Sequence, residues 1–130
     1  MKTRKFKTLS FYPIYKKWCC LHNFPILEEQ NTPQSIYITY NDQNTPIYCC
    51  FLWNTDSKMC IIGYPVSNPE VEYKEKEGGL EHLFQTIKED ITGIYDLIWT
   101  TSATPRIIEV LEKVGFILGD QNVNHYICKV

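Results

Sequence analysis

The sequence predicts one α/β (α+β) domain over residues 1–130, and three observations support this prediction. Residues 35–66 hold three runs rich in β-branched and aromatic residues, separated by short turns. Two later segments, Leu80–Asp90 and Pro105–Val114, carry apolar residues at helical spacing. A buried-type strand, Tyr95–Thr100, lies between these helices, so strands and helices alternate in the last third. A chain of 130 residues can bury one core and is too short for two.

The first two elements occupy the N-terminal segment. Lys5–Phe11 alternates polar and apolar residues, which predicts a strand. The following segment, Tyr12–Asn23, reads as a helix with Pro13 in its first turn. Three apolar residues share one face of this helix: Ile14, Trp18 and Leu21. Phe24–Ser35 contains two prolines and several polar residues, which indicates a loop or a poorly formed second helix.

The middle of the chain predicts an antiparallel meander of three strands. The strands are Ser35–Tyr40, Ile47–Trp53 and Met59–Val66, and the turns between them are short and polar. Pro65 cannot donate a ladder hydrogen bond, so we expect it at the end of its strand or at a bulge.

A polar loop, Ser67–Glu77, leads to Gly78-Gly79, which opens the Leu80–Asp90 helix. The next strand, Asp96–Thr100, contains three consecutive apolar residues at 97–99. Such a run predicts burial on both faces, as in a central strand.

The last helix has clear end signals. Thr104 is a good N-cap, Pro105 suits the first helical position, and Gly115 is placed for a left-handed C-cap. The expected inward stripe consists of Ile107, Ile108, Leu111 and Val114. A polar turn and a closing strand, His125–Val130, complete the predicted order.

Charge and composition exclude several function classes. The formal net charge is −2, so no global basic field attracts nucleic acid or an anionic membrane. No apolar run approaches bilayer-spanning length, and no apolar stretch of the secretory type follows the basic N-terminal residues. We therefore expect a cytoplasmic protein with neither nucleic acid nor membrane as a partner.

The six cysteines do not predict a metal site. Cys19-Cys20 and Cys49-Cys50 are adjacent pairs, and adjacent residues on a strand point to opposite faces. The three histidines are dispersed, without zinc-type spacing, and we expect structural or exposed positions for them, with His82 on the outer face of its helix. In a reducing compartment the thiols are expected to act as small buried apolar groups.

The order of elements resembles that of the GNAT superfamily, the acyl-coenzyme A-dependent N-acetyltransferases. The likeness covers roughly residues 5–130 and is best in the last third and in VSNPEVEYKEKEGGLEHLF. It implies a central mixed, mostly antiparallel twisted sheet of six to seven strands flanked by three to four helices. It also implies a cleft for acetyl-CoA between the central strands. Length and loop composition resemble the short GNAT-like proteins of bacteriophages.

The GNAT phosphate loop reads Arg/Gln-x-x-Gly-x-Gly/Ala and opens a helix. Here Lys74 lies at the Arg/Gln position, Gly79 at the last small position, and Glu77 where the first glycine belongs. A helix N-terminus reached by close-packed glycine backbone suits a pyrophosphate. Glu77 adds an unfavourable charge, which Lys74 and Lys76 can offset, and Gly78 keeps one point of close approach. The alternative interpretation is a solvated loop with a flexible helix start.

The resemblance assigns further cofactor contacts. The backbone of Val66 and Ser67 would pair with the pantetheine amides, and the hydroxyls of Thr101 and Ser102 would contact the cofactor or the acyl group. Equally, those hydroxyls could cap the following helix. Leu111 occupies the position of the tyrosine that commonly protonates the leaving thiolate, and leucine cannot donate a proton. The catalytic residues are therefore left unassigned.

Two functions stay open at this point. The first is an N-acetyltransferase that moves an acetyl group from acetyl-CoA to a small-molecule or protein amine, with homodimerisation as a family habit. The second is a catalytically inactive GNAT-fold binding or assembly protein, of phage type, whose cleft is closed by Trp99, Tyr64 or the Glu77 loop. A third reading is an unrelated α+β interaction domain without parting strands.

Overall fold

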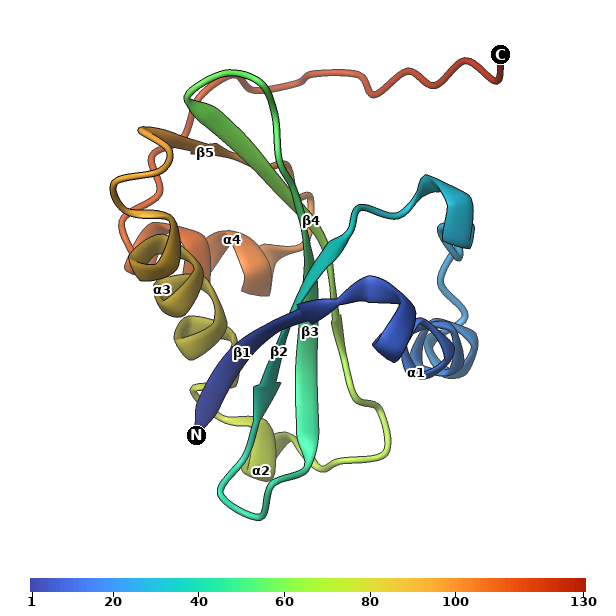
Figure 1. Cartoon of the computed structure of the whole chain (residues 1–130). Coiled ribbons are helices and arrows are strands. Elements are labelled where there is room, and N and C mark those ends of the chain that lie inside the picture. Colours follow the sequence, from blue (N-terminus) through green and yellow to red (C-terminus); the bar gives the residue numbers. More distant parts are fainter.

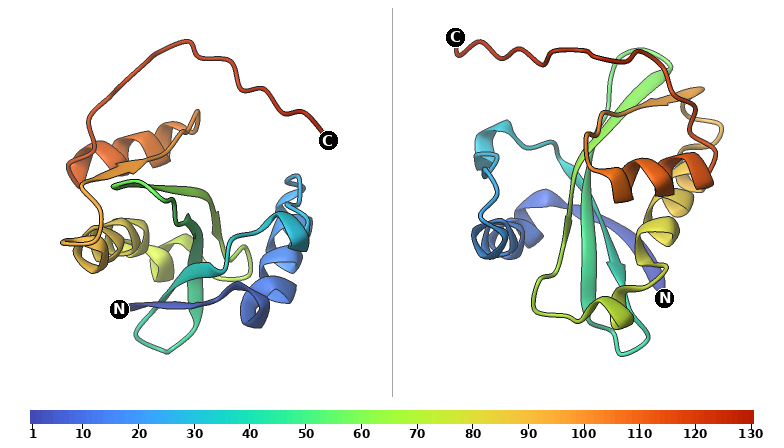
Figure 2. Two further views of the ribbon diagram at one scale, coloured as in Figure 1. Left: turned by 45° about the horizontal axis from the view of Figure 1, so that its top comes forward. Right: turned by 180° about the vertical axis from the view of Figure 1, so that it is seen from behind.

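A five-stranded sheet forms the centre of the computed structural model, which describes residues 1–130 (Figure 1). One helix, α1, covers one face of the sheet, and α3 and α4 cover the other (Figures 1 and 2). In chain order the elements are β1 (Lys2–Lys7), α1 (Thr8–His22), the 3-10 turn η1 (Glu29–Asn31), β2 (Ser35–Tyr40), β3 (Pro46–Trp53), β4 (Met59–Ser67), the single-turn α2 (Tyr73–Lys76), α3 (Gly79–Ile91), β5 (Leu97–Trp99) and α4 (Pro105–Lys113). None of these helices has both the length and the hydrophobicity that a membrane crossing requires.

The sheet is mixed and mostly antiparallel, in the order β1-β2-β3-β4-β5. The first four strands pair antiparallel with their neighbours, so the predicted meander is confirmed, and β5 pairs parallel with β4. The prediction of six to seven strands is wrong, because the sheet has five. The predicted closing strand, His125–Val130, has no ladder partner.

The N-terminal strand ends earlier than predicted. β1 ends at Lys7 and α1 begins at Thr8, whereas the sequence placed the boundary at Tyr12. The helical stripe already includes Phe11, which is buried with Tyr15 and Trp18. Two expected members of the inward face, Ile14 and Leu21, are exposed.

Two hydrophobic cores lie on opposite faces of the sheet. We call them the α1-side core and the α3-side core. The α1-side core consists of Phe11, Tyr15, Trp18, Cys19, Ile36, Ile38, Cys49, Phe51 and Val66. The α3-side core consists of Tyr37, Cys50, Leu52, Cys60, Ile62, Leu80, Leu83, Phe84, Ile87, Ile91, Val110 and Leu111. The adjacent thiols of Cys49 and Cys50 thus enter different cores, as strand geometry predicts.

Four of the six cysteines act as small buried groups. Cys20 and Cys128 differ from this expectation, because both are exposed. All six thiols are free.

β5 lies at the edge of the sheet, where the sequence predicted a central strand. Its side chains are partly solvated: Leu97 is 64% exposed and Trp99 51% exposed. Only Ile98 packs against the α3-side core. The apolar run predicted burial on both faces of the strand, but the face that bears Leu97 and Trp99 is largely exposed.

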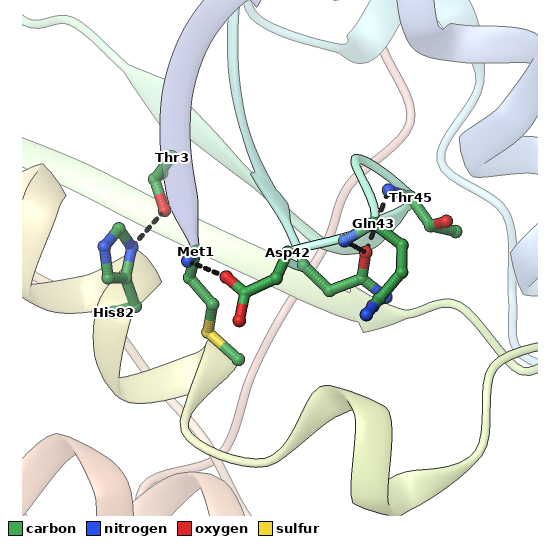
Figure 3. Close-up of polar contacts among 7 residues, drawn as sticks. Met1, Thr3, Asp42, Gln43, Thr45 and His82 are labelled. Atoms are coloured by element: carbon green, nitrogen blue, oxygen red, sulfur yellow. Dashed lines mark hydrogen bonds and ion pairs between the residues drawn. The ribbon is translucent and has the colours of Figure 1, made fainter.

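α3 is fixed to the sheet at its first turn. A Cβ added at Gly79 would lie 2.6 Å from Cδ1 of Ile47, so the helix begins in direct contact with β3. Figure 3 shows His82, whose Nδ1 lies 2.7 Å from the Thr3 hydroxyl of β1. The outer-face prediction for His82 is therefore wrong, because this side chain joins α3 to the sheet. The Met1 ammonium makes a second link near this corner, 2.6 Å from Asp42 (Figure 3).

α4 has the predicted ends but a rotated inward face. It begins after Thr104 and stops before Gly115, whose φ of +98° is left-handed. Val110 and Leu111 are its buried residues, whereas Ile107 and Ile108, which were expected to face inward, are half-buried. The end of the helix is held by Phe116, whose ring lies 6.3 Å from that of Phe84.

Candidate functional site

The central feature of the candidate site is the point where β4 and β5 part. Only Met59–Ile61 of β4 pair with β5, opposite Leu97–Trp99. β4 continues to Ser67, so residues 62–67 have no partner on the β5 side. We call these residues the open edge. Unpaired backbone amides along a strand can bind an extended ligand as a further strand would.

A β-bulge bends β4 in the middle of the open edge. Phe51 pairs with Gly63 and Cys49 pairs with Val66, so Cys50 faces both Tyr64 and Pro65. The bulge is one of the two positions predicted for Pro65, whose missing N–H needs no ladder partner there.

Tyr64 has an unusual backbone at this bulge. Its φ is +53°, in the left-handed region, and its side chain is 44% exposed. Left-handed non-glycine residues are strained by about 1–3 kcal/mol and cluster at functional sites. The Tyr64 ring lies 5.9 Å from the ring of Trp53, on the exposed part of the sheet.

The C-terminal end of the open edge is bound by a histidine that sequence reasoning did not select. Nε2 of His22 lies 2.9 Å from the carbonyl oxygen and 3.1 Å from the hydroxyl of Ser67. The His22 ring also stacks on Phe24, with 4.6 Å between ring centroids. His22 and Ser67 are 45 positions apart, and no local pattern in the sequence signals this contact. Val66, beside Ser67, is buried in the α1-side core.

The glycine turn, residues 77–79, follows the helical turn α2, which lies in a segment predicted to be a loop. Gly78 is the N-cap of α3, with φ +79° and no side-chain cap. The first helical hydrogen bond runs from His82 N–H to the Gly78 carbonyl, at 3.0 Å. The preceding N–H groups of α3 therefore have no partner within the helix, which is the arrangement that binds anions.

The two lysines of this region differ in their surroundings. Lys74 is exposed. Lys76 is half-buried, and its ammonium donates to the Asn68 carbonyl at 2.9 Å. Burial lowers the pKa of Lys76. Lys76 therefore fastens the loop between β4 and α2, while Lys74 is free to meet a ligand.

A surface groove of about 730 Å³ continues from the glycine turn between α3 and α4. Glu77 and Gly78 line its start, and Glu81, Arg106 and Lys113 line its floor. The Glu81 carboxylate lies 3.2 Å from the Arg106 guanidinium and 3.9 Å from the Lys113 ammonium. The carboxylate in the first turn of α3 is thus balanced by two cations, whereas Glu77 is exposed and has no ion-pair partner.

The hydroxyls after β5 lie at the far end of the open edge. Thr101 is exposed, and Ser102 accepts a hydrogen bond from the Thr104 N–H at 3.2 Å. Ser102 therefore satisfies a backbone donor just before α4, but no side chain caps the helix itself.

Register relates these positions to one another. Trp99 pairs with Ile61, and Ser67 pairs with Tyr48, whose ring would touch a Cβ on Gly79 at 2.9 Å. Ser67 and Gly79 therefore share one neighbour. Ile61 lies about 20 Å from Ser67 along β4, at 3.3 Å per residue. The hydroxyls of Thr101 and Ser102 follow Trp99, so they begin near Ile61 and far from Ser67.

The position expected for a catalytic tyrosine contains no proton donor. Leu111 is 8% exposed and belongs to the α3-side core. Truncation or enlargement of this side chain would act first on packing.

Comparison with known proteins was informative only for structure. No protein-family model matches the chain, and a search of curated proteins found no match. A solved structure of a probable acetyltransferase has a TM-score of 0.69 at 17% identity, covering 100% of this chain and 98% of that one. A probable acetyltransferase from meticillin-resistant Staphylococcus aureus gives 0.66 at 9% identity, covering 99% and 100%.

A GNAT family acetyltransferase from Streptococcus pneumoniae has a TM-score of 0.58 at 12% identity, covering 96% of this chain and 98% of that one. At such identities the likeness shows the fold alone. The chain has the fold of the GNAT acetyltransferases.

Proposed function

We propose that the chain is an acyl-CoA-dependent N-acyltransferase that moves an acetyl group from acetyl-CoA to an amine. The observation that carries this proposal is the open edge of β4, residues 62–67, which leads toward the uncapped N-terminus of α3. The acetyltransferases that share the fold support the same coarse assignment. The acceptor is a small-molecule or protein amine, and the proposed location is the cytoplasm.

The residues present fit coenzyme A. In this proposal the backbone of Val66 and Ser67 pairs with the pantetheine amides, and the N–H groups of Gly78 and Gly79 hold the pyrophosphate. No atom lies within 4 Å of a Cβ position on Gly78, so space for a phosphate is open there. Lys74 supplies a free cation beside this turn, and the groove between α3 and α4 offers room for the nucleotide part.

Electrostatics favour this assignment only in part. Glu77 is exposed beside Gly78, and its charge opposes a phosphate. Glu81 adds little repulsion, because Arg106 and Lys113 neutralise it. Lys76 is engaged with Asn68, which leaves Lys74 as the main counter-charge.

Acetyl-CoA supplies an activated acyl carbonyl as its thioester. Backbone N–H groups at the bulge of β4 can stabilise negative charge on that carbonyl oxygen. The amine must lose a proton during transfer, and the thiolate of coenzyme A must gain one. Leu111 can do neither. The two side chains at the open edge that can move a proton are the Tyr64 hydroxyl and the His22 imidazole.

A catalytically inactive GNAT-fold binding or assembly protein, of the kind compared above with phage proteins, is the second candidate. Two observations favour it. Leu111 is a core residue in place of the usual acid, and His22 already occupies the carbonyl of Ser67. Such a protein would keep the fold and use the same surface to hold a partner without acyl transfer.

Calorimetric titration with acetyl-CoA and with desulfo-coenzyme A tests the proposal. We expect micromolar binding, about −8 kcal/mol. Lys74→Glu should weaken binding about tenfold, or roughly 1.4 kcal/mol. Lys16→Glu is the matched control, since Lys16 is exposed on α1 across the sheet. Absence of binding up to millimolar concentration would exclude the enzyme.

Acyl transfer is then measured as free coenzyme A released in the presence of a polyamine, a lysine peptide or a free peptide N-terminus. Tyr64→Phe and His22→Gln separate the two proton carriers, because the first keeps the ring and removes the hydroxyl, and the second removes the imidazole but keeps an N–H donor for the Ser67 carbonyl. Binding without transfer to any amine class would support the second candidate.

A further inference from the structure

An uncovered apolar surface lies on the α1 side of the sheet, beside the bulge of β4. We call it the aromatic face, and it consists of Trp53, Ile61, Tyr64, Leu97 and Trp99. Ladder pairing aligns Trp53, Ile61 and Trp99 across β3, β4 and β5. Trp53 packs against the α1-side core, which fixes the side of the sheet on which this row lies. In Figures 1 and 2, α1 lies away from β5, and Tyr64, Leu97 and Trp99 are exposed.

The aromatic face adjoins the bulge directly. A Cβ on Gly63 would lie 3.4 Å from Cζ3 of Trp53, so the Trp53 ring lies over the backbone of Gly63. The Trp53 ring is 5.8 Å from the ring of Phe51 and 5.9 Å from the ring of Tyr64, spacings that are typical of aromatic pairs. The rings therefore form a series that runs from the α1-side core outward to solvent, and a further ring from a ligand can extend it.

The opposite side of the bulge is closed. Cys50 and Ile62 are buried in the α3-side core, and the Cys50 thiol donates to the Gly63 carbonyl at 3.4 Å. Under the proposed function the thioester carbonyl lies at this bulge. An acceptor amine must then approach it from the α1 side, over the aromatic face.

The strands below the aromatic face contain no charged residue. Lysine, arginine, histidine, aspartate and glutamate are all absent from β3, β4 and β5. An ammonium group that moves onto this surface loses water and gains no counter-ion from the strands, which favours the uncharged amine. The uncharged amine is the form that attacks a carbonyl carbon. A polyamine would bring further charges without partners, whereas an aromatic amine brings one charge and a ring that can stack.

We propose that the aromatic face binds the acceptor, and that this acceptor is a primary amine joined to an aromatic ring by a short linker. The inference rests on the proposed function and names its substrate class. Trp99 pairs with Ile61, which lies about 7 Å from Gly63 along β4 at 3.3 Å per residue. A ring stacked between Trp53 and Trp99 therefore holds an amine on a short linker at the bulge.

The transfer that this geometry serves balances in atoms and charge. The amine nitrogen forms a bond to the acetyl carbonyl carbon, and the bond between that carbon and the sulfur of coenzyme A breaks. One proton leaves the nitrogen and one is gained by the departing thiolate. The products are the N-acetylated aromatic amine and free coenzyme A.

Acceptor kinetics test the substrate class, with free coenzyme A as the measured product. We expect kcat/KM for phenethylamine to exceed the values for butylamine, spermidine and a lysine peptide by about tenfold. Trp99→Ala should lower the value for phenethylamine by about three- to tenfold, with a smaller loss for butylamine and unchanged acetyl-CoA binding. Leu9→Ala is the matched control, because Leu9 is an exposed apolar residue on α1 outside the aromatic face, and it should leave both values unchanged.

Tryptophan fluorescence provides a measurement that needs no acyl transfer. Trp18 is buried, so an aromatic quencher in solution reaches only the other two tryptophans, Trp53 and Trp99. Nitrophenethylamine should quench the full chain saturably, and its apparent Kd should rise about three- to tenfold in Trp99→Ala. Trp53→Leu, which keeps an apolar side chain against the α1-side core, should weaken the quenching in the same way. Circular dichroism shows that each variant is folded.

The outcomes separate this inference from the proposed function. Release of coenzyme A without a preference for phenethylamine would overturn the substrate class and leave the proposed function intact. Saturable quenching without release to any amine would support the aromatic face as a binding surface, and it would overturn both its role as the acceptor site and the proposed function. Quenching that does not saturate, together with no release, would overturn both.

Discussion

Gly79→Ala tests how closely α3 must approach the sheet. An alanine Cβ would lie 2.6 Å from Cδ1 of Ile47 and 2.9 Å from Cδ2 and Cε2 of Tyr48. Carbon atoms in contact prefer about 3.5–4.0 Å, so the helix or these two side chains must move by roughly 1 Å. Ile47 is fully buried, so its side chain cannot move out into solvent to make room.

The expected cost follows from packing and from chain entropy. Overpacking a close-packed site costs about 1–3 kcal/mol. Replacing glycine by alanine also stabilises the fold by about 0.4–1 kcal/mol, because it lowers the conformational entropy of the unfolded chain. The net loss in the free energy of unfolding is therefore about 1–2 kcal/mol. With an unfolding entropy of roughly 2.1 cal/mol/K per residue over 130 residues, the melting temperature should fall by about 4–7 °C.

The assay is urea unfolding followed by tryptophan fluorescence, with thermal melting as a second measurement. Gly119→Ala is the neutral control, because no atom lies within 4 Å of its Cβ position. Gly78→Ala has open space but a φ of +79°, so it should lose about 1–2 kcal/mol through backbone strain alone. A Gly79→Ala protein as stable as the Gly119→Ala control would refute the close approach of α3 to β3.

Three further predictions concern the cores and their links. Leu111→Ala should lower the free energy of unfolding by about 2–4 kcal/mol in urea, because Leu111 is a core residue; a loss below about 1 kcal/mol would place this side chain outside the core. Burial raises the pKa of the Cys50 thiol to about 12, above its value in the unfolded chain. The contribution of this thiol to stability is therefore complete below about pH 9 and is lost as the pH rises toward 12, at up to roughly 1.4 kcal/mol per pH unit. The stability of Cys50→Ala should decline less steeply at alkaline pH than that of the unchanged protein, and identical slopes would contradict the burial of Cys50. Thr3→Val removes a hydroxyl that bonds both His82 and the buried Thr39 hydroxyl, and it should cost about 1–2 kcal/mol in the same unfolding assay. Thr55→Val, whose hydroxyl bonds Ser57 and the Met59 carbonyl, is the comparison that leaves α3 unaffected.

Local patterns were sufficient to predict the meander and the two longer helices that follow it, α3 and α4, but not the single turn of α2. β2 was placed at its observed bounds, and Pro65 at a bulge, because strand chemistry is local. The boundary between β1 and α1 was missed because Lys5–Phe11 alternates like a strand while Phe11 begins a helical stripe. The spacing of apolar residues here fits both the two-residue period of a strand and the 3.6-residue period of a helix, and the packing of Phe11 in the core selects the helix.

The role of β5 and the contact made by His22 depend on the whole fold. A run such as Leu97–Trp99 indicates two covered faces, but cover depends on segments distant in sequence, and at this edge of the sheet Leu97 and Trp99 stay exposed. His22 meets Ser67 because α1 has the length and angle to bring its last turn to the end of β4. Gly78 and Gly79, in contrast, were predictable, since the chemistry of a helix start is contained in a few neighbouring residues.

The separation of the two cores at Cys49-Cys50 decides how the destabilising effects of substitutions combine. The Cys49 thiol lies in the α1-side core and the Cys50 thiol in the α3-side core, and the backbone of the sheet separates the two cores. Side chains on opposite faces that lie more than about 7–10 Å apart and share no partner contribute independently, so losses from one such substitution on each face should add within about 0.5 kcal/mol. The domain therefore has two separate reserves of stability, and the face bearing α3, the glycine turn and the groove can change in sequence without disturbing the packing under α1.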